Sequence, residues 1–134
     1  MHITGGCHCG NITYEAEIDP EMVSICHCSD CQKLSGSAFR VVAFAKAEDF
    51  HLHGTPTIYI KTAESGNQRA QAFCPQCGSA LYASAPDNSP NYGIRLGTCD
   101  QRAELVPKRQ VWHQSALPWL SSKLDMGKIL ERQQ

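Results

Sequence analysis

Three cysteines within six residues, in the segment C-H-C-S-D-C that starts at Cys26, constrain this chain more than any other feature. Cysteines at this spacing converge on one thiophilic metal ion, usually Zn²⁺, more readily than they act separately. A structural zinc takes four protein ligands, whereas a catalytic zinc keeps three and leaves one position for water or substrate. The trio Cys26, Cys28 and Cys31 therefore predicts a metal site that is either open or completed from elsewhere in the chain.

Two further cysteine pairs stand far apart in the sequence. Cys7 and Cys9 form a C-x-C pair between glycines, and Cys74 and Cys77 form a C-P-Q-C-G pair. Paired knuckles from distant segments commonly close one tetrahedral zinc site, because each knuckle supplies two ligands. This pairing leaves the trio without a partner pair. The spacing alone does not decide whether the trio is an open site or a second structural site completed by Cys99 or a histidine.

Glycines beside the two pairs predict how the backbone bends there. An extended segment places Cys7 and Cys9 on one face but too far apart for one zinc, so the backbone has to bend. We expect Gly5, Gly6 and Gly10 to supply that freedom, and Gly78 to take the positive φ that a tight knuckle requires.

Short runs of alternating apolar residues, interrupted by Gly and Pro, predict an all-β fold with only short helical turns. One helical turn after Cys28, capped by Ser29 or Asp30, would bring Cys31 round to the other two thiols. From Ser121 onward the sequence predicts at most one weak helix with a frayed end. We expect strands at residues 11–18, 22–25, 39–45, 51–53, 57–62, 69–73, 79–84, 92–98 and 110–113.

The 134 residues fit a single domain over 1–134, with a core at about 5–120 and a tail at 121–134. The chain shows neither a signal-peptide pattern nor an apolar run near the ~20 residues that span a bilayer. We therefore expect a cytoplasmic protein without membrane contact, in which the eight cysteines bind metal rather than form disulfides. The formal charge of −1, or about −4 with seven thiolates and two Zn²⁺, argues against nucleic acid as a partner.

Five stretches resemble the family of the glutathione-dependent formaldehyde-activating enzyme (GFA), which includes centromere protein V. They are GGCHCG, CHCSDCQKLSGSAF, FCPQCGSALY, RLGTCD and VWHQSALPW, and they match in order and spacing from about Gly5 to Trp119. The resemblance implies a Mss4-like fold of several small antiparallel sheets cross-linked by zinc. It also implies two zinc ions per chain, a structural one on Cys7, Cys9, Cys74 and Cys77 and a catalytic one on Cys26, Cys28 and Cys31.

The resemblance further implies a carbon–sulfur lyase that makes or breaks S-hydroxymethylglutathione, with glutathione or another thiol and an aldehyde as partners. Three thiolates hold zinc less tightly than four, so we expect partial occupancy or oxidation at the trio. The chain departs from the family pattern at Cys99, where relatives have an apolar residue, and at Gln110, where relatives have a histidine that is here displaced to His113. The alternatives are a zinc-stabilised binding module without catalysis and a redox enzyme that uses Cys99, although a lone cysteine is most often an inert, partly buried thiol.

Glutathione is an anion, so an acidic, metal-loaded chain that binds it needs cations near the trio. Arg40, Lys33 and Arg95 are the candidates, although each can equally be a solvated surface charge. We hypothesise that at least one of them holds a carboxylate, for which the guanidinium fork is better suited than an ammonium group.

Overall fold

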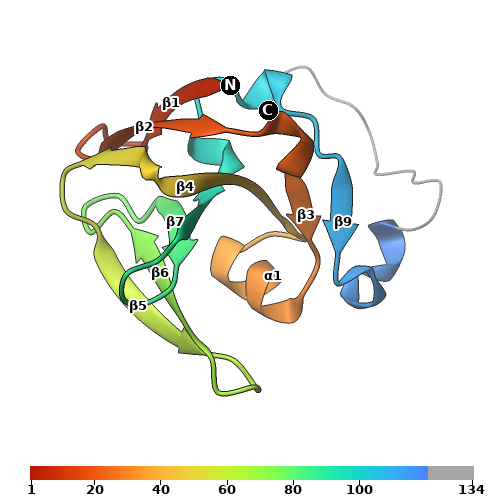
Figure 1. The fold of residues 1–134 in the computed structure, drawn as a ribbon. Coiled ribbons are helices and arrows are strands. Elements are labelled where there is room, and N and C mark those ends of the chain that lie inside the picture. The colour runs from red at the N-terminus through yellow and green to blue at the C-terminus, as the bar shows by residue number, and fades with distance from the viewer. Residues whose placement is uncertain (121–134) are drawn as a thin grey trace, which may run out of the picture.

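A computed structural model describes residues 1–120, and the weak helix expected from Ser121 lies outside the described residues. Within residues 1–120 the structure is mostly antiparallel sheet with one α-helix and short 3₁₀ turns, which confirms the all-β prediction (Figure 1). The helix is α1 (Ser29–Ser35). The strands are β1 (His2–Gly6), β2 (Thr13–Ile18), β3 (Ser24–Cys26), β4 (Arg40–His53), β5 (Thr57–Thr62), β6 (Gln68–Phe73), β7 (Ala80–Ser84), β8 (Asn91–Arg95) and β9 (Arg109–Val111).

Strand β4 is the centre of the sheet, whose order is β1-β2-β4-β8-β7-β6-β5, with β3 beside β4 and β9 beside β3. Along its 14 residues β4 pairs with β3, β8 and β2, and Figure 1 shows it running from beside β2 to beside β3, with β9 beyond its end. The prediction of two separate strands at 39–45 and 51–53 is wrong. Lys46 and Glu48 are exposed and give no apolar pattern, while the backbone stays extended between the pairing of Lys46 with β8 and the pairing of Phe50 with β2, across an irregularity in the ladder.

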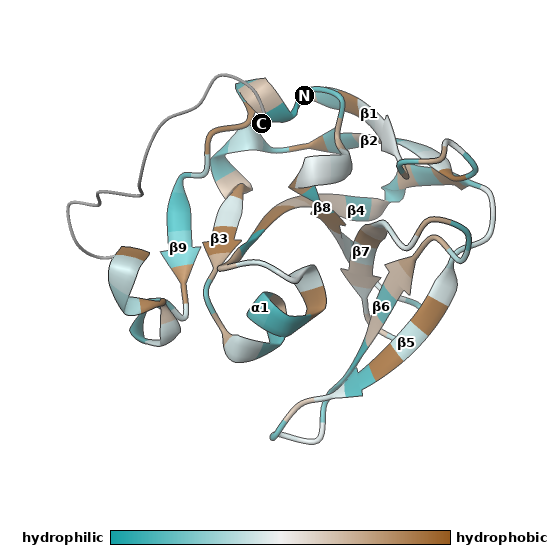
Figure 2. Ribbon diagram, turned by 180° about the vertical axis from the view of Figure 1, so that it is seen from behind, coloured by the Kyte–Doolittle hydropathy of each residue, from teal (hydrophilic) through white to brown (hydrophobic). Residues whose placement is uncertain are grey.

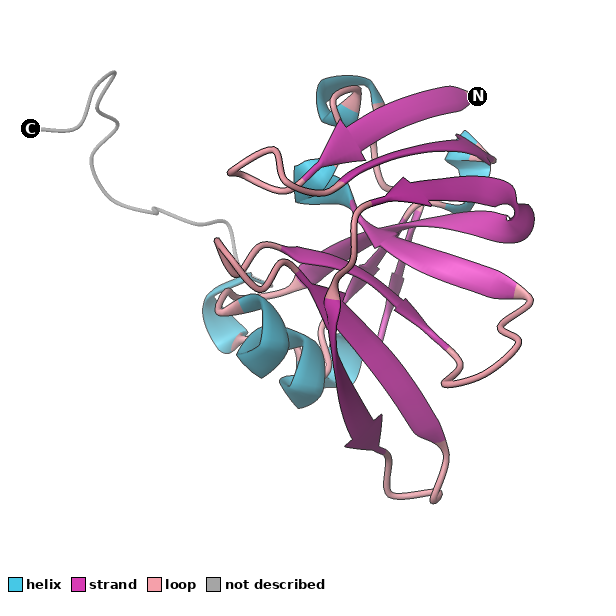
Figure 3. Cartoon of the chain, turned by 90° about the vertical axis from the view of Figure 1, so that its left-hand side faces the viewer, coloured by secondary structure: helices cyan, strands magenta, loops and turns pink. Residues whose placement is uncertain are grey.

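Alternation along β4 separates two faces of the sheet. Ala43 and Ala45 point into the main core, where they pack with Ile3 and Ile94. Apolar residues accordingly gather on the strands around β4 and β7, whereas β9 is mostly hydrophilic (Figure 2). The opposite face of β4 lies toward α1, which rests against the strands in Figure 3. No helix within residues 1–120 combines the length and the apolar composition that a membrane span requires.

Strand β1 was not expected, because two of its five residues are glycines and give no apolar signal. Gly5 pairs with Tyr14 of β2 and also forms a bridge with Cys99. A Cβ atom on Gly5 would collide with Thr98 O and with the Tyr14 ring. Gly5 therefore permits a close approach of three segments. Of Gly5, Gly6 and Gly10, only Gly10 has a positive φ (+80°), and it bends the loop after β1.

The collision at Gly5 gives a stability prediction. Gly5→Ala is expected to lower the free energy of unfolding by about 1–3 kcal/mol, because Thr98 O belongs to the backbone and cannot move aside cheaply. Gly97→Ala is the matched control, since a Cβ there meets no atom within 4 Å and Gly97 has no positive φ. Urea denaturation of both variants measures the difference, and equal midpoints for the two would contradict it.

Candidate metal centres

The first candidate centre joins the loop after β1 to the turn after β6. The sulfur atoms of its four cysteines all lie within 4.8 Å of one another. The Sγ atoms of Cys7 and Cys9 are 3.6 Å apart, and those of Cys9 and Cys74 are 3.7 Å apart. A disulfide would need ~2.05 Å, whereas two sulfurs on one tetrahedral zinc at ~2.3 Å each are separated by roughly 3.8 Å. The spacing fits a shared metal ion, with ligands Cys7, Cys9, Cys74 and Cys77.

Local hydrogen bonds hold these sulfurs in place. Ile12 donates its backbone N–H to Cys7 Sγ at 3.2 Å, and Gly78 donates to the Cys74 carbonyl at 2.8 Å. Gly78 has the expected positive φ of +78°. The Ser79 hydroxyl lies 3.3 Å from Cys77 Sγ, and this contact followed by the Ser79 backbone N–H lowers the pKa of Cys77 to about 5. The knuckle thus favours the thiolate form that a metal needs.

The second candidate centre is the trio Cys26, Cys28 and Cys31, whose sulfur atoms also lie within 4.8 Å of one another. Cys26 ends β3, and Cys31 lies in the first turn of α1. Within residues 1–120 no fourth His, Cys, Asp or Glu side chain joins this group. Burial, followed by the neighbouring Cys26, raises the pKa of the Cys31 thiol to about 12, so this sulfur stays protonated near neutral pH unless a cation binds.

The helix cap at the trio differs from the predicted one. Cys28 is the N-cap of α1, and its Sγ accepts a hydrogen bond from the Cys31 backbone N–H at 3.3 Å. The prediction of Ser29 or Asp30 as the cap is wrong, because the sulfur already faces the first turn. Gly36 ends the helix with a φ of 63°, in the left-handed region that glycine adopts without strain.

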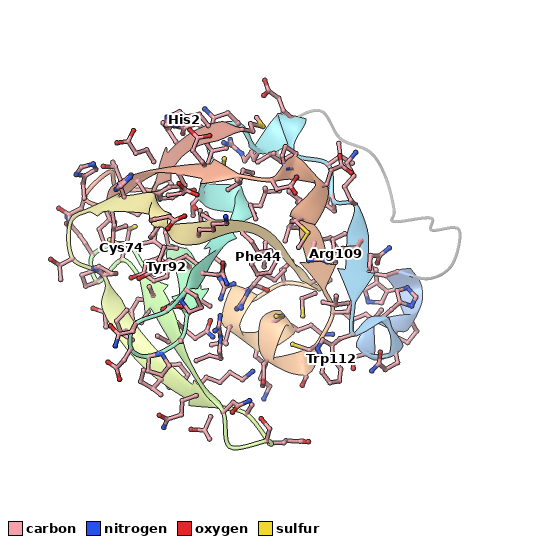
Figure 4. The ribbon with its side chains drawn as sticks, in the orientation of Figure 1. His2, Phe44, Cys74, Tyr92, Arg109 and Trp112 are labelled. Atoms are coloured by element: carbon pink, nitrogen blue, oxygen red, sulfur yellow. The ribbon has the colours of Figure 1, made fainter. Side chains whose placement is uncertain are left out.

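Strand β9 and the segment after it contact the residues around the trio. His27 is 3% exposed, donates its backbone N–H to Val111 O, and forms a 2.6 Å hydrogen bond from Nε2 to Gln110. Gln32 of α1 donates to both His27 O and Ser115 O. Figure 4 shows Trp112 at the end of β9 on the side of α1. The sequence did not predict the contact between His27 and Gln110. The departure from the family pattern at Gln110 was the one feature that could have drawn attention to this position.

Cys99 lies away from both clusters. Its side chain is 0% exposed, and its thiol lies 3.5 Å from Gln101 Oε1. Burial raises the pKa of Cys99, which disfavours the reactive thiolate. These properties are those of an inert core thiol rather than a metal ligand or a redox nucleophile.

The three candidate cations have different surroundings. Arg40 and Arg95 are 7% and 8% exposed and line the same cavity of about 200 Å³, whereas Lys33 is exposed on α1. Burial, followed by the positive charge of the neighbouring Arg40, lowers the pKa of Arg95 to about 9. The structure therefore brings two of the three cations together.

Both clusters can hold a metal ion, and donor sets made only of sulfur are compatible with zinc. A family model described as glutathione-dependent formaldehyde-activating enzyme matches residues 2–115. The fold is similar to that in a crystal structure of a Rhodobacter sphaeroides protein, with a TM-score of 0.62 and 20% sequence identity over 81% of this chain and 99% of that chain. Because the family model matches most of the sequence, including all seven clustered cysteines, the chain belongs to the glutathione-dependent formaldehyde-activating enzyme (GFA) family.

Proposed function

We propose that this protein is a zinc-dependent carbon–sulfur lyase that acts on S-hydroxymethylglutathione or a similar thiol–aldehyde adduct. In the forward direction the thiol sulfur bonds to the carbon of formaldehyde, and the carbonyl oxygen takes a proton. The reverse direction breaks the carbon–sulfur bond and releases both molecules. The observation that carries the proposal is the trio, because three sulfurs without a fourth ligand among residues 1–120 leave a position for a substrate thiol.

A free thiol with a pKa of ~8.5 is mostly protonated at neutral pH and is a weak nucleophile in that form. Zinc at the trio would supply the positive charge that stabilises a substrate thiol as its thiolate. The chain itself fixes where that happens, because Cys26 ends a strand and Cys28 caps the helix that carries Cys31. Gln32 links this loop to the segment after β9, because it donates to both His27 O and Ser115 O.

The two sets of cysteines have different proposed roles. The four-sulfur cluster connects segments 65 residues apart, between Cys9 and Cys74, which suits a structural zinc. A binding module without catalysis would be expected to fill its second site with a fourth protein ligand. A redox enzyme based on Cys99 would be expected to expose that thiol, which is 0% exposed.

The test is the rate at which formaldehyde and glutathione exchange with their adduct, measured by NMR magnetisation transfer. Formaldehyde and thiols combine without a catalyst, so each rate has to be compared with the same mixture lacking protein. Zinc-loaded protein at micromolar concentration is expected to accelerate exchange, and metal-free protein is the control. An unchanged exchange rate at full zinc content would rule out lyase activity on this adduct.

A further inference from the structure

The strand registers place buried arginines on the same face of the sheet as the trio. Val42 of β4 pairs with Ser24 of β3 on one side and with Arg95 of β8 on the other. Directly paired residues share a face, and residues two positions apart along a strand do so as well. Arg40 is two residues before Val42, and Cys26 is two residues after Ser24, so both lie on the same face as Arg95. Arg40 and Cys26 also pair directly with each other.

Two more arginines extend this cationic face away from the trio. Arg109 of β9 pairs with Ser24 and donates from Nε to its hydroxyl at 2.8 Å. Arg109 and Arg69 of β6 line a second cavity of about 380 Å³, whose wall includes the exposed Phe44. Figure 4 shows Phe44 and Arg109 on the side of the sheet where α1 lies.

None of these four arginines forms an ion pair with a carboxylate within residues 1–120. On this side of the sheet Asp30 of α1 is already paired with Lys61 at 2.6 Å. Arg95 Nη2 donates to Gln71 Oε1 at 2.6 Å, and Arg40 Nε is buried without a hydrogen-bond partner among the described residues. Buried charges normally have partners, because an unpaired one is strongly destabilising. Arg40 therefore keeps a buried donor without a partner among residues 1–120, and the partner of Arg95 Nη2 is a neutral amide.

The arginines are also close enough to the trio to act on the same small molecule. Arg40 pairs directly with Cys26 across β3 and β4, and Arg95 lines the same cavity as Arg40. The shared cavity of about 200 Å³ has Gln71 and Tyr59 in its wall. It is smaller than a typical ligand pocket of ~300–1,000 Å³, so it suits one charged end of a ligand rather than a whole tripeptide.

We propose that Arg40 and Arg95 form a carboxylate site that holds the charged end of the substrate while its sulfur lies at the trio. The substrate class is thus a thiol that carries a carboxylate several bonds from its sulfur. The thiol part of this inference rests on the proposed function, whereas the carboxylate site stands on the arginines themselves. A guanidinium pair suits this role because each fork can bind a carboxylate through two parallel hydrogen bonds.

The test uses S-methylglutathione, which keeps both carboxylates of glutathione but has no free thiol. Calorimetric titration into zinc-loaded protein is expected to show binding that Arg40→Gln weakens about 10- to 100-fold, the effect of losing charge-assisted hydrogen bonds. Arg95→Gln is expected to do the same. Lys46→Gln is the matched control, because Lys46 is an exposed cation on the same strand and face as Arg40. The affinity of this variant for S-methylglutathione should stay within about 2-fold of wild type.

Thermal denaturation separates binding from a structural role. Arg40→Gln should keep or raise Tm, because it removes a buried charge that has no partner among residues 1–120. Equal affinity of wild type and Arg40→Gln for S-methylglutathione would overturn the inference, and so would the absence of any binding to wild type.

Cysteamine, a thiol without a carboxylate, keeps the two proposals apart. Its affinity should be the same for wild type and Arg40→Gln, which would show that the arginine acts on the carboxylate. A parallel loss of cysteamine binding in Arg40→Gln would overturn the carboxylate site, because it would show that Arg40 acts on the thiol site instead. If the lyase assay fails instead, the difference in S-methylglutathione binding still stands as evidence for the arginine site.

Discussion

Cys74→Ser is expected to leave the chain largely unfolded at 25 °C. The Cys74 sulfur is 0% exposed and belongs to the cluster that joins the loop after β1 to the turn after β6. Structural zinc contributes roughly 10–16 kcal/mol of apparent binding free energy in small zinc domains, which is comparable to a whole domain's stability of ~5–15 kcal/mol. Losing one of four ligands removes much of that contribution. Circular dichroism and zinc content per chain measure the outcome.

Cys99→Ser is the matched control for this variant. Cys99 is equally buried but lies in neither metal cluster, so the serine variant should stay folded with full metal content and lose about 1–3 kcal/mol at most. A Cys74→Ser protein with wild-type zinc content and wild-type Tm would show that the four-sulfur cluster does not hold the fold together.

Cys28→Ser is expected to abolish the acceleration of adduct exchange while the fold is retained. The trio lies at intermediate exposure and outside both apolar core clusters, so losing its metal should not open the core. Serine is also a good N-cap, so the hydroxyl can accept the Cys31 N–H in place of the sulfur and keep α1 in place. Zinc content should fall from two ions to about one, with unchanged circular dichroism.

Cys28→Ala extends this experiment because alanine removes both the ligand and the cap. It should lose the same metal ion as Cys28→Ser and an additional ~1 kcal/mol of stability. A mild chelator should likewise strip one metal ion from wild type and leave the fold unchanged. Simultaneous loss of both metal ions with unfolding, in Cys28→Ser or under chelation, would show that the two centres do not have separate roles.

The division of the cysteines could be predicted from the sequence because ligand spacing is local. The three cysteines of the trio lie within six residues of one another. The pairs Cys7/Cys9 and Cys74/Cys77 each form a knuckle, so each group can be recognised without the fold. Most of the short apolar strands followed from alternation in the same way, but the strand predicted at 92–98 ends at Arg95, where the 3₁₀ turn Leu96–Thr98 begins. Gly78 could also be assigned, because a tight knuckle needs a residue that adopts positive φ without strain.

The features that were missed depend on partners distant in the sequence. The continuity of β4 past Lys46 depends on pairing with β8 up to Lys46 and with β2 again from Phe50, which leaves no side-chain pattern. Arg40 and Arg95 were candidates from the sequence, but their shared face with Arg109 depends on the registers that align Arg95 with Val42 and Arg109 with Ser24. A shift of one residue in any of these registers would turn the arginine to the opposite face, so single-residue accuracy in the pairing is required.

The separation of the ligands in the chain also affects the order in which the two centres form during synthesis. The trio closes within six residues, so it can capture a metal ion as soon as that stretch leaves the ribosome. The proposed four-sulfur centre cannot form until Cys77 has been made, because Cys7 and Cys9 supply only two of its four sulfurs. Throughout that interval these two thiols are exposed to oxidants and to competing soft metals. The nascent chain is therefore expected to be most sensitive to oxidative and copper stress before residue 77 is reached, even though the finished protein buries Cys7.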